Sequence, residues 1–453
     1  MMARPRQTIV SLEETPNYHC CSCVVRKAFS CGLDDVTDEH VEHRREWVDS
    51  RIVKLATIFA IDIHACARLL IRKSVTPLLF ATVIYILLGC GSPNAIANAT
   101  DNPVVLLDSY YSDLYAWNEQ GGLEQTQLGR GINLGNYLEA PVEGEWSGGR
   151  VLIEDDLQRI AAAGFKTVRI PVRWSAHADL TFPYAINARF MARVKEVVGW
   201  ANNAHLKVIL NVHHYTKMMH DPESQQAGHI LRLQGIWQQM SEQFPLSEYG
   251  HDNLIFELLN EPNSSIDHSD WNNIIARLLT VIWGDMAAQQ NNGTTQRTVM
   301  IGSANWSQPD DLAKLRLPSS VNARNTIITI HYYKPFHFTH QGAKWVNGAD
   351  DWIGTRWLGT QSDQAPLIAM FDRVTRWNAQ ANRGFEIFIG EFGVYSRSVD
   401  PDQQKAWTAF IAREAEKRNM SWAYWEYASG FGAYDANKGQ WRPKLIEALI
   451  PVQ

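Results

Sequence analysis

The chain has 453 residues, of which 45% are apolar, so it is long enough and apolar enough to bury a sizeable core. Its formal net charge is −6, which argues against nucleic acid or an anionic membrane as the main partner. All six cysteines lie in the first ninety residues, so the rest of the chain is neither a disulfide scaffold nor a thiolate metal site.

The first hundred residues include a segment typical of export. A basic flank at 68–73 precedes an apolar run at 78–88, which is too short to span a bilayer comfortably. With the small residues that follow, it predicts a signal peptide over 68–99. Leu87-Leu88-Gly89-Cys90 is similar to a lipoprotein cleavage box that would lipidate Cys90, whereas Ala97-Asn98-Ala99 would suit an ordinary signal peptidase. We expect a secreted, periplasmic or outer-surface protein, lipid-anchored in the first case.

Residues 1–67 precede this segment, although a signal peptide should begin at the amino terminus. The sequence has no methionine between Met2 and Met191. We therefore expect residues 1–67 to be a non-native or disordered extension, with the natural start at a non-Met codon near Val75 or slightly upstream of it. The alternative is a long cytoplasmic extension before a membrane anchor.

From residue 103 onward, eight strand-like apolar runs alternate with amphipathic segments of helical length. The strand-like runs are 131–137, 166–173, 207–214, 254–262, 298–306, 326–336, 385–395 and 421–429, and the helical segments include 154–163, 189–203 and 404–417. Apolar strands that alternate with helices are typically parallel and buried on both faces. Eight such units predict an α/β fold of the closed (β/α)8 TIM-barrel type over 103–453.

Polar and aromatic residues gather at the carboxyl ends of these runs, which is where barrel enzymes carry out their chemistry. They are Asn133, Asn136, Arg169, His213, His214, Asn260, Glu261, Trp306, His331, Tyr333, Glu391 and Trp425. Asn260-Glu261-Pro262 and Gly390-Glu391-Phe392-Gly393 each place one glutamate there. Two carboxylates presented in this way suit cleavage of a glycosidic bond, because one can protonate the leaving oxygen while the other attacks the sugar.

Several motifs together carry a resemblance to a known family. They are Gly131-Ile132-Asn133-Leu134-Gly135-Asn136, Val168-Arg169-Ile170-Pro171, His213-His214, the two glutamate motifs, His331-Tyr332-Tyr333 and Trp422-Ala423-Tyr424-Trp425-Glu426. Residues 103–453 resemble glycoside hydrolase family 5, and residues 332–343 are similar to its bacterial endoglucanases. The resemblance implies a retaining endo-β-1,4-glucanase that hydrolyses cellulose-type β-glucan. We expect it to use no cofactor and to act as a monomer.

The resemblance also implies the roles of individual residues. Glu261 would be the general acid/base and Glu391 the nucleophile, with carboxyl groups roughly 5–5.5 Å apart. Arg169 would belong to the substrate-binding residues and would keep Glu391 ionised through its positive charge. Asn260 would bind the sugar 2-hydroxyl, and Trp425 would stack under the sugar at the cleaved bond.

The remaining site residues have less specific expected roles. Tyr333 would donate to Glu391, His331 would fix the acid/base or the substrate, and His213 matches the family's strand-3 histidine better than His214. Sugar hydroxyls would be bound by Asn133, Asn136 and Glu139. The candidates for neighbouring sugar subsites are Trp146, Trp174, Trp306, Trp345, Trp352 and Trp357. No metal is expected, because no pattern of Asp, Glu or Cys completes a site around the paired histidines.

Two other functions remain open. The same barrel could be a β-mannanase or another β-glycanase, if the loop around the cleavage subsite differs and accepts an axial 2-hydroxyl. It could also be a glycan-binding barrel without catalytic activity. The presence of both Glu261 and Glu391 argues against the second function, because an inactive descendant would often have lost one of them.

Overall fold

The computed structural model describes residues 128–284, 296–380 and 383–451. The chain divides into two units, 1–97 and 98–453, and every described residue belongs to the second. The predicted extension, the predicted signal peptide and Cys90 lie outside the described residues. Within the described ranges, none of the helices combines the length and the apolar composition needed to cross a membrane.

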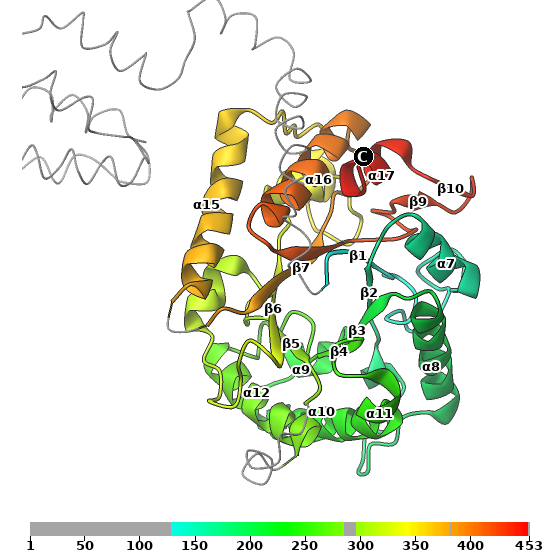
Figure 1. The fold of residues 1–453 in the computed structure, drawn as a ribbon, viewed down its shortest axis with the longest axis vertical. Helices are drawn as coiled ribbons and strands as arrows, with labels where there is room; N and C mark the ends of the chain where they lie inside the picture. The colour runs from blue at the N-terminus through cyan, green and yellow to red at the C-terminus, as the bar shows by residue number, and fades with distance from the viewer. Residues whose placement is uncertain (1–127, 285–295, 381–382, 452–453) are drawn as a thin grey trace, which may run out of the picture. The chain divides into compact units, whose positions relative to one another are not determined.

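Eight parallel strands close into a barrel in their sequence order (Figure 1). They are β1 (Arg130–Asn133), β2 (Thr167–Ile170), β3 (Lys207–Asn211), β4 (Leu254–Glu257), β5 (Val299–Ile301), β6 (Thr326–His331), β7 (Glu386–Phe392) and β8 (Ser421–Tyr424). Every neighbouring pair is parallel, and Ile132 of β1 closes the circle by pairing with Tyr424 of β8. The predicted (β/α)8 barrel is confirmed.

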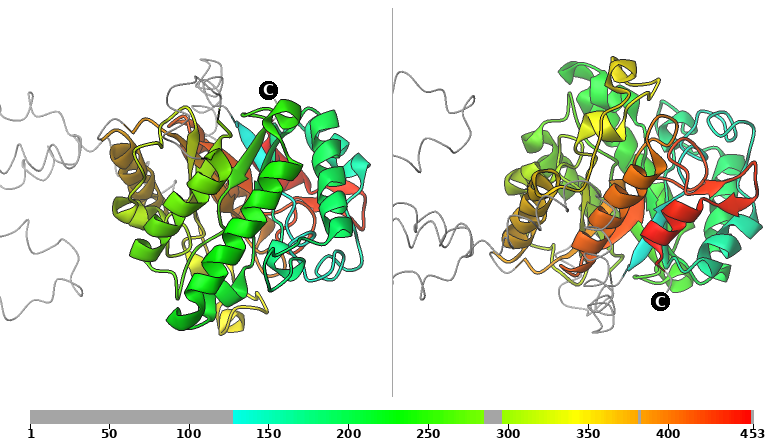
Figure 2. Two further views of the ribbon diagram at one scale, coloured as in Figure 1. Left: turned by 90° about the horizontal axis from the view of Figure 1, so that it is seen from below. Right: turned by 90° about the horizontal axis from the view of Figure 1, so that it is seen from above.

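Helices surround this barrel in all three views (Figures 1 and 2). They are α7 (Glu154–Ala162), α8 (Ala188–Asn203), α9 (Thr216–His220), α10 (Glu223–Gln243), α11 (Leu246–Tyr249), α12 (His268–Trp283), α14 (Phe336–Thr339), α15 (Gln361–Asn378), α16 (Pro401–Glu416) and α17 (Pro443–Leu449). Short 3-10 helices are η2 (Trp174–Ala176), η3 (Pro309–Lys314) and η4 (Ala349–Trp352), and a small antiparallel pair joins β9 (Tyr434–Asp435) to β10 (Gln440–Trp441). The three predicted helical segments correspond to α7, α8 and α16.

Side chains at the starts of several helices explain where they begin. Asp267 caps α12, Thr360 caps α15 and Asp400 caps α16, each by accepting hydrogen bonds from backbone N–H groups of the first turn. Such a side-chain oxygen satisfies a donor that has no partner within the helix. Pro401 occupies the first position of α16, where the φ angle that its ring fixes is already close to the helical value.

The interior of the barrel is packed separately from its outer wall. The inner group is Leu128, Ile209, Ile255, Met300, Ile327, Phe388 and Ala423. Val208 and Leu210, the neighbours of Ile209 on β3, belong instead to the larger cluster between strands and helices, as the alternation of side chains along a strand requires. This inner layer of side chains makes the barrel a solid support for residues at its carboxyl end.

The strands end earlier than the sequence predicted. The run 254–262 forms a strand only as far as Glu257, and the run 298–306 only as far as Ile301. Beyond these points, Glu261 has a φ of 46° and Trp306 a φ of 59°, in the left-handed region that a strand cannot use. The predicted strand ends are wrong because apolar residues continue into loops that bend away from the sheet and present the polar side chains.

Candidate active site

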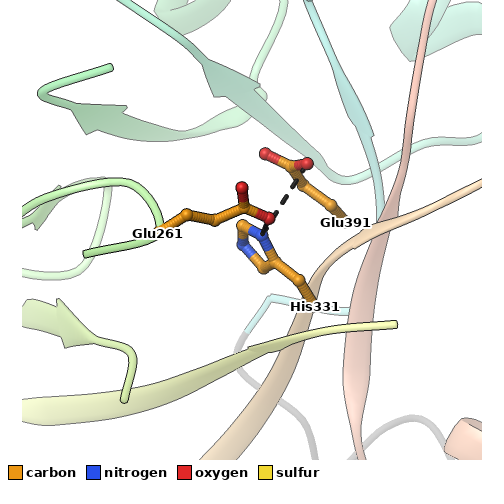
Figure 3. A group of neighbouring side chains, drawn as sticks. All are labelled: Glu261, His331 and Glu391. Carbon is orange, nitrogen blue, oxygen red and sulfur yellow. Dashed lines mark hydrogen bonds and ion pairs between the residues drawn. The ribbon is translucent and has the colours of Figure 1, made fainter. Parts of the chain in front are cut away.

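Two glutamates that are far apart in the sequence lie close together at the carboxyl end of the barrel (Figure 3). Glu261 lies on the loop after β4, and Glu391 lies near the end of β7. An oxygen of each carboxyl group and a ring nitrogen of His331 all lie within 4.8 Å of one another. The Glu261 side chain is 23% exposed and that of Glu391 only 7%. Solvent therefore reaches Glu261 more readily than Glu391.

His331 links the two carboxyl groups. Its Nδ1 lies 2.7 Å from Oε1 of Glu261 and 3.7 Å from Oε2 of Glu391. The ladder between β6 and β7 shifts register at Ile330 and His331, so that His331 pairs with Glu391. Burial by itself would lower the pKa of His331, but the negative charge of Glu391 and the hydrogen bond to Glu261 outweigh burial and raise it.

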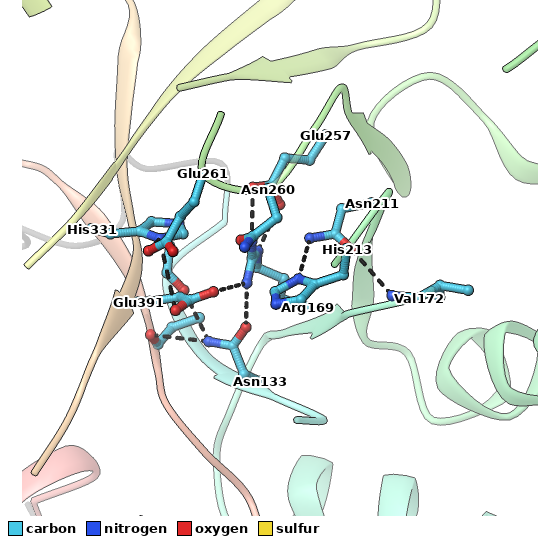
Figure 4. Close-up of polar contacts among 12 residues, drawn as sticks. Asn133, Arg169, Val172, Asn211, His213, Glu257, Asn260, Glu261, His331 and Glu391 are labelled. Atoms are coloured by element: carbon cyan, nitrogen blue, oxygen red, sulfur yellow. Dashed lines mark hydrogen bonds and ion pairs between the residues drawn. The ribbon is translucent and has the colours of Figure 1, made fainter. Parts of the chain in front are cut away.

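Arg169 on β2 is fully buried and organises the floor of the site (Figure 4). Its Nε and Nη2 donate to the two oxygens of Glu257 at 2.6 and 2.8 Å. Its Nη1 donates to Oε1 of Glu391 at 2.8 Å and to Oδ1 of Asn133 at 2.9 Å, and Nη2 also donates to Oδ1 of Asn260 at 2.7 Å. A guanidinium has five N–H donors, and these bonds use all of them.

The surroundings push the pKa values of the two glutamates in opposite directions. Burial would raise the pKa of Glu391, but His331, Arg169 and the hydrogen bond from the Tyr333 hydroxyl at 2.9 Å outweigh it and lower the pKa. Burial raises the pKa of Glu261 and the negative charge of Glu391 adds to this effect, and together they outweigh the hydrogen bond from His331 and the positive charges of His331 and Arg169, which lower it. The site therefore favours an ionised Glu391 beside a protonated Glu261.

The third and eighth strands lead to a histidine and a tryptophan whose rings lie nearly parallel to each other. The rings of His213 and Trp425 are 5.8 Å apart with an angle of 12° between their planes. His213 is buried, whereas Trp425 is partly exposed and the adjacent His214 is exposed. The rings of His214 and Trp146 meet in a T-shaped arrangement, with their centroids 5.4 Å apart.

The candidate subsite tryptophans differ widely in how much of each side chain is exposed. Trp146, Trp306 and Trp345 are 39%, 46% and 62% exposed, so part of each side chain is accessible to a ligand. Trp352 is partly buried. Trp174 and Trp357 are 0% and 1% exposed, so the prediction that they form subsites is wrong. Both are large apolar side chains that fill the core between strands and helices.

Three residues predicted to contact sugar are placed where they cannot do so. Asn133 is fully buried. Its Oδ1 accepts a hydrogen bond from Arg169, and its Nδ2 donates to the carbonyl oxygens of Gly390, Ala423 and Tyr424. Arg169 is fully buried too. Glu139 is also fully buried and accepts from the backbone N–H groups of Asn136 and Tyr137.

These three predictions are therefore wrong as regards direct contact, because each side chain faces the protein and its polar atoms are occupied by protein groups. The other prediction for Arg169, that its charge keeps Glu391 ionised, is confirmed by its bond to Oε1 of Glu391. Asn136 remains partly exposed, with a φ of 71°.

Sequence reasoning missed two buried polar residues. Glu257 balances the charge of Arg169, and Asn211 bonds Nδ1 of His213 through its Nδ2 at 3.1 Å. A signal for Glu257 exists, because a charged residue within the apolar run Leu254–Leu259 requires a buried partner. Arg169, on another strand-like run, was the available cation.

Glu261, His331 and Glu391 could each offer one donor atom to a metal ion. The three groups are already hydrogen-bonded to one another or to Arg169 and Tyr333. The positive charge of Arg169 beside them also disfavours a cation. The arrangement therefore suits proton transfer, and the absence of a metal remains a prediction.

The sequence of this chain is similar to those of known proteins. The family described as "Cellulase (glycosyl hydrolase family 5)" matches residues 129–430. Endoglucanase H of Acetivibrio thermocellus is 34% identical over 309 residues, which cover 68% of this chain. The match covers only 30% of that protein and 39% of the cellulase/esterase CelE of the same organism, so the chain spans about a third of these relatives.

Solved structures resemble the chain over nearly their whole length. Thermotoga maritima Cel5A in complex with cellobiose is 43% identical, with a TM-score of 0.64 over 71% of this chain and 97% of that one. The same enzyme in complex with mannotriose is 42% identical, with a TM-score of 0.65 over 72% of this chain and 99% of that one.

Glu257 should matter for stability as the main counter-charge of a buried arginine. We expect Glu257→Gln to lower the free energy of unfolding by about 3–5 kcal/mol, because it leaves Arg169 without that charge. Urea unfolding followed by tryptophan fluorescence would measure this. The control is Glu447→Gln, which breaks a pair with Lys405 in which Glu447 is 53% exposed and should cost less than about 1 kcal/mol. Equal losses for the two variants would contradict the role given to Glu257.

Proposed function

The chain belongs to glycosyl hydrolase family 5, the cellulase family, and from this membership we propose that it is an endo-β-1,4-glucanase acting on cellulose-type β-glucan. The enzyme cleaves the glucan by double displacement, with retention of configuration at the anomeric carbon. The observation that carries the proposal is the pair of neighbouring carboxyl groups whose pKa values are shifted in opposite directions. A retaining glycosidase needs one ionised and one protonated carboxyl group at this separation.

In the first step, the ionised Glu391 attacks the anomeric carbon and forms an ester bond to the sugar. Glu261 gives its proton to the leaving oxygen as the glycosidic bond breaks. In the second step, Glu261 takes a proton from a water molecule, which attacks the same carbon. The ester bond to Glu391 breaks, and the two glutamates return to their starting states.

The surroundings of Glu391 explain how Glu261 can serve first as an acid and then as a base. Arg169 and Tyr333 each bond one oxygen of Glu391 and hold it ionised. When the ester forms, the negative charge of Glu391 disappears. Because that charge helps to keep Glu261 protonated, its loss favours the deprotonated form that the second step needs.

Asn260 is placed to bind the sugar next to the nucleophile. Its Oδ1 accepts a hydrogen bond from Arg169 at 2.7 Å, which directs its Nδ2 donors away from the arginine. Asn260 is 8% exposed, beside Glu261. An amide donor there can bond the 2-hydroxyl of the sugar, a contact that strengthens in the transition state.

Two features support the proposed substrate. Partly exposed Trp425 and exposed Trp306 and Trp345 offer aromatic faces for successive sugars, and Cel5A of Thermotoga maritima has been solved with cellobiose. The same enzyme solved with mannotriose keeps β-mannan as a second candidate substrate. We further propose that the protein is exported through residues 68–99, followed either by lipidation at Cys90 or by ordinary signal-peptidase cleavage at Ala97-Asn98-Ala99.

The proposed activity is tested by reducing-end release from carboxymethylcellulose, with galactomannan in a parallel assay. We expect the higher rate on the cellulose derivative. A preference for mannan would change the substrate and leave the mechanism in place. No release from either polymer by folded protein would contradict the proposed activity.

The proposed acid is tested by changing the leaving group. Glu261→Ala should lower the rate on carboxymethylcellulose by roughly 10²–10⁴-fold, because the leaving oxygen loses its proton donor. In the glycosylation step, the loss should be much smaller on an aryl glycoside whose phenolate leaves without protonation. The control is Glu248→Ala, at an exposed glutamate of α11, which should leave both rates unchanged. Equal losses on both substrates for Glu261→Ala would rule out Glu261 as the acid.

A further inference from the structure

The amide of Asn211 has only one orientation that satisfies its neighbours. Its Oδ1 accepts the backbone N–H of Val172 at 3.2 Å, and its Nδ2 lies 3.1 Å from Nδ1 of His213 (Figure 4). The reverse orientation would put the amide NH₂ against the N–H of Val172, so that two donors would face each other. Since Asn211 is fully buried, no solvent is available to relieve that mismatch.

This orientation determines where His213 carries its proton. An amide NH₂ can only donate, so Nδ1 of His213 must accept and cannot bear a hydrogen. The single proton of the neutral ring then lies on Nε2. Within the described part of the chain, no protein group forms a hydrogen bond to this Nε2. His213 therefore has one nitrogen fixed by the protein and one N–H donor left over.

The charges around His213 make the position of this proton important. Burial lowers the pKa of His213 well below its usual value. The neighbouring His214, Arg169 and His331 lower it further, as does Arg173. The ring therefore stays neutral. Because a neutral imidazole has a single N–H, it can donate to a ligand only if that hydrogen is on the nitrogen that faces the ligand.

We propose that Asn211 is a positioning residue that holds His213 in its Nε2–H form, so that His213 donates a hydrogen bond to a hydroxyl oxygen of the sugar stacked on Trp425. The proposal rests on the proposed function, since it takes the ligand to be a sugar. The ring planes of His213 and Trp425 are nearly parallel and their centroids are 5.8 Å apart, so the imidazole lies next to the tryptophan on which this sugar would stack. Asn211 does not touch the substrate and acts through His213 alone.

An aspartate at position 211 would keep the size and shape of the side chain but would make Nδ1 of His213 the hydrogen-bond donor instead of the acceptor. Its carboxylate could still accept the N–H of Val172, but it would also accept from Nδ1 of His213. The pKa of His213 would rise beside the new negative charge. Below that raised pKa the ring is doubly protonated and keeps its Nε2–H. Above it, the remaining proton stays on Nδ1, and the donor toward the sugar is lost.

The test compares kcat/KM of wild type and Asn211→Asp on a soluble cello-oligosaccharide across a pH series. We expect the ratio of variant to wild type to fall as pH rises, reaching a loss of roughly tenfold, which equals about 1.4 kcal/mol and is the size of one hydrogen bond. A ratio that stays constant with pH would overturn the proposal, because a merely structural defect would weaken the enzyme equally at every pH.

Asn325→Asp provides the matched control. Asn325 is also buried and hydrogen-bonded, but it lies just before β6, at the amino-terminal end of the barrel. The same chemical change there should give a ratio to wild type that does not vary with pH. A fall like that of Asn211→Asp would show that any buried aspartate produces the effect, and would overturn the proposal.

A spectroscopic measurement on the wild type does not depend on the variants folding. In protein labelled with ¹⁵N-histidine, the ring signals of His213, identified by their loss in His213→Gln, should show a protonated Nε2 and a bare Nδ1. The opposite tautomer would overturn the role of Asn211, even in an active enzyme. A wild type with the expected tautomer but no activity on any β-glucan would instead overturn the proposed function, and with it the sugar contact.

Discussion

The complete hydrogen bonding of one buried cation, Arg169, is the constraint on which the rest of the site depends. A guanidinium removed from water is tolerated only when its charge and its donors are compensated. Glu257 supplies most of that compensation through two short bonds, so Arg169 can bond Glu391 and Asn260 with its remaining donors. In this way one side chain of β2 fixes residues from β4 and β7, and any displacement of it would disturb both.

The barrel places the two glutamates in different surroundings, and each environment suits a different chemical role. Glu391 lies within a strand, largely enclosed, and is bonded at both oxygens by Arg169 and Tyr333, so its geometry and charge are fixed. Glu261 lies on a loop, is more exposed, and has the titratable His331 as its partner. A nucleophile benefits from the first environment, because its position must be exact. An acid that later becomes a base benefits from the second, because its protonation must change.

The sequence predicted the barrel and the two glutamates, because alternating apolar runs and polar strand ends are local patterns. It did not predict the contacts of Asn133, which resembles a sugar ligand in sequence but is enclosed by β7 and β8. Glu257 and Asn211 were missed because their importance comes from partners far away in the sequence. Arg169 lies on β2, two strands away from Glu257 on β4, and Val172 lies just after β2. The overestimated strand ends have a similar cause, since apolar composition does not reveal where φ becomes positive.

The stereochemistry of the first product tests the central claim most directly, because it depends on both glutamates acting in sequence. Proton NMR during hydrolysis of a cello-oligosaccharide distinguishes the β-anomer from the α-anomer before mutarotation mixes them. Attack by Glu391 followed by attack of water inverts the anomeric carbon twice, so the account predicts that the β-anomer appears first. Initial release of the α-anomer would mean a single displacement by water and would contradict the role assigned to Glu391.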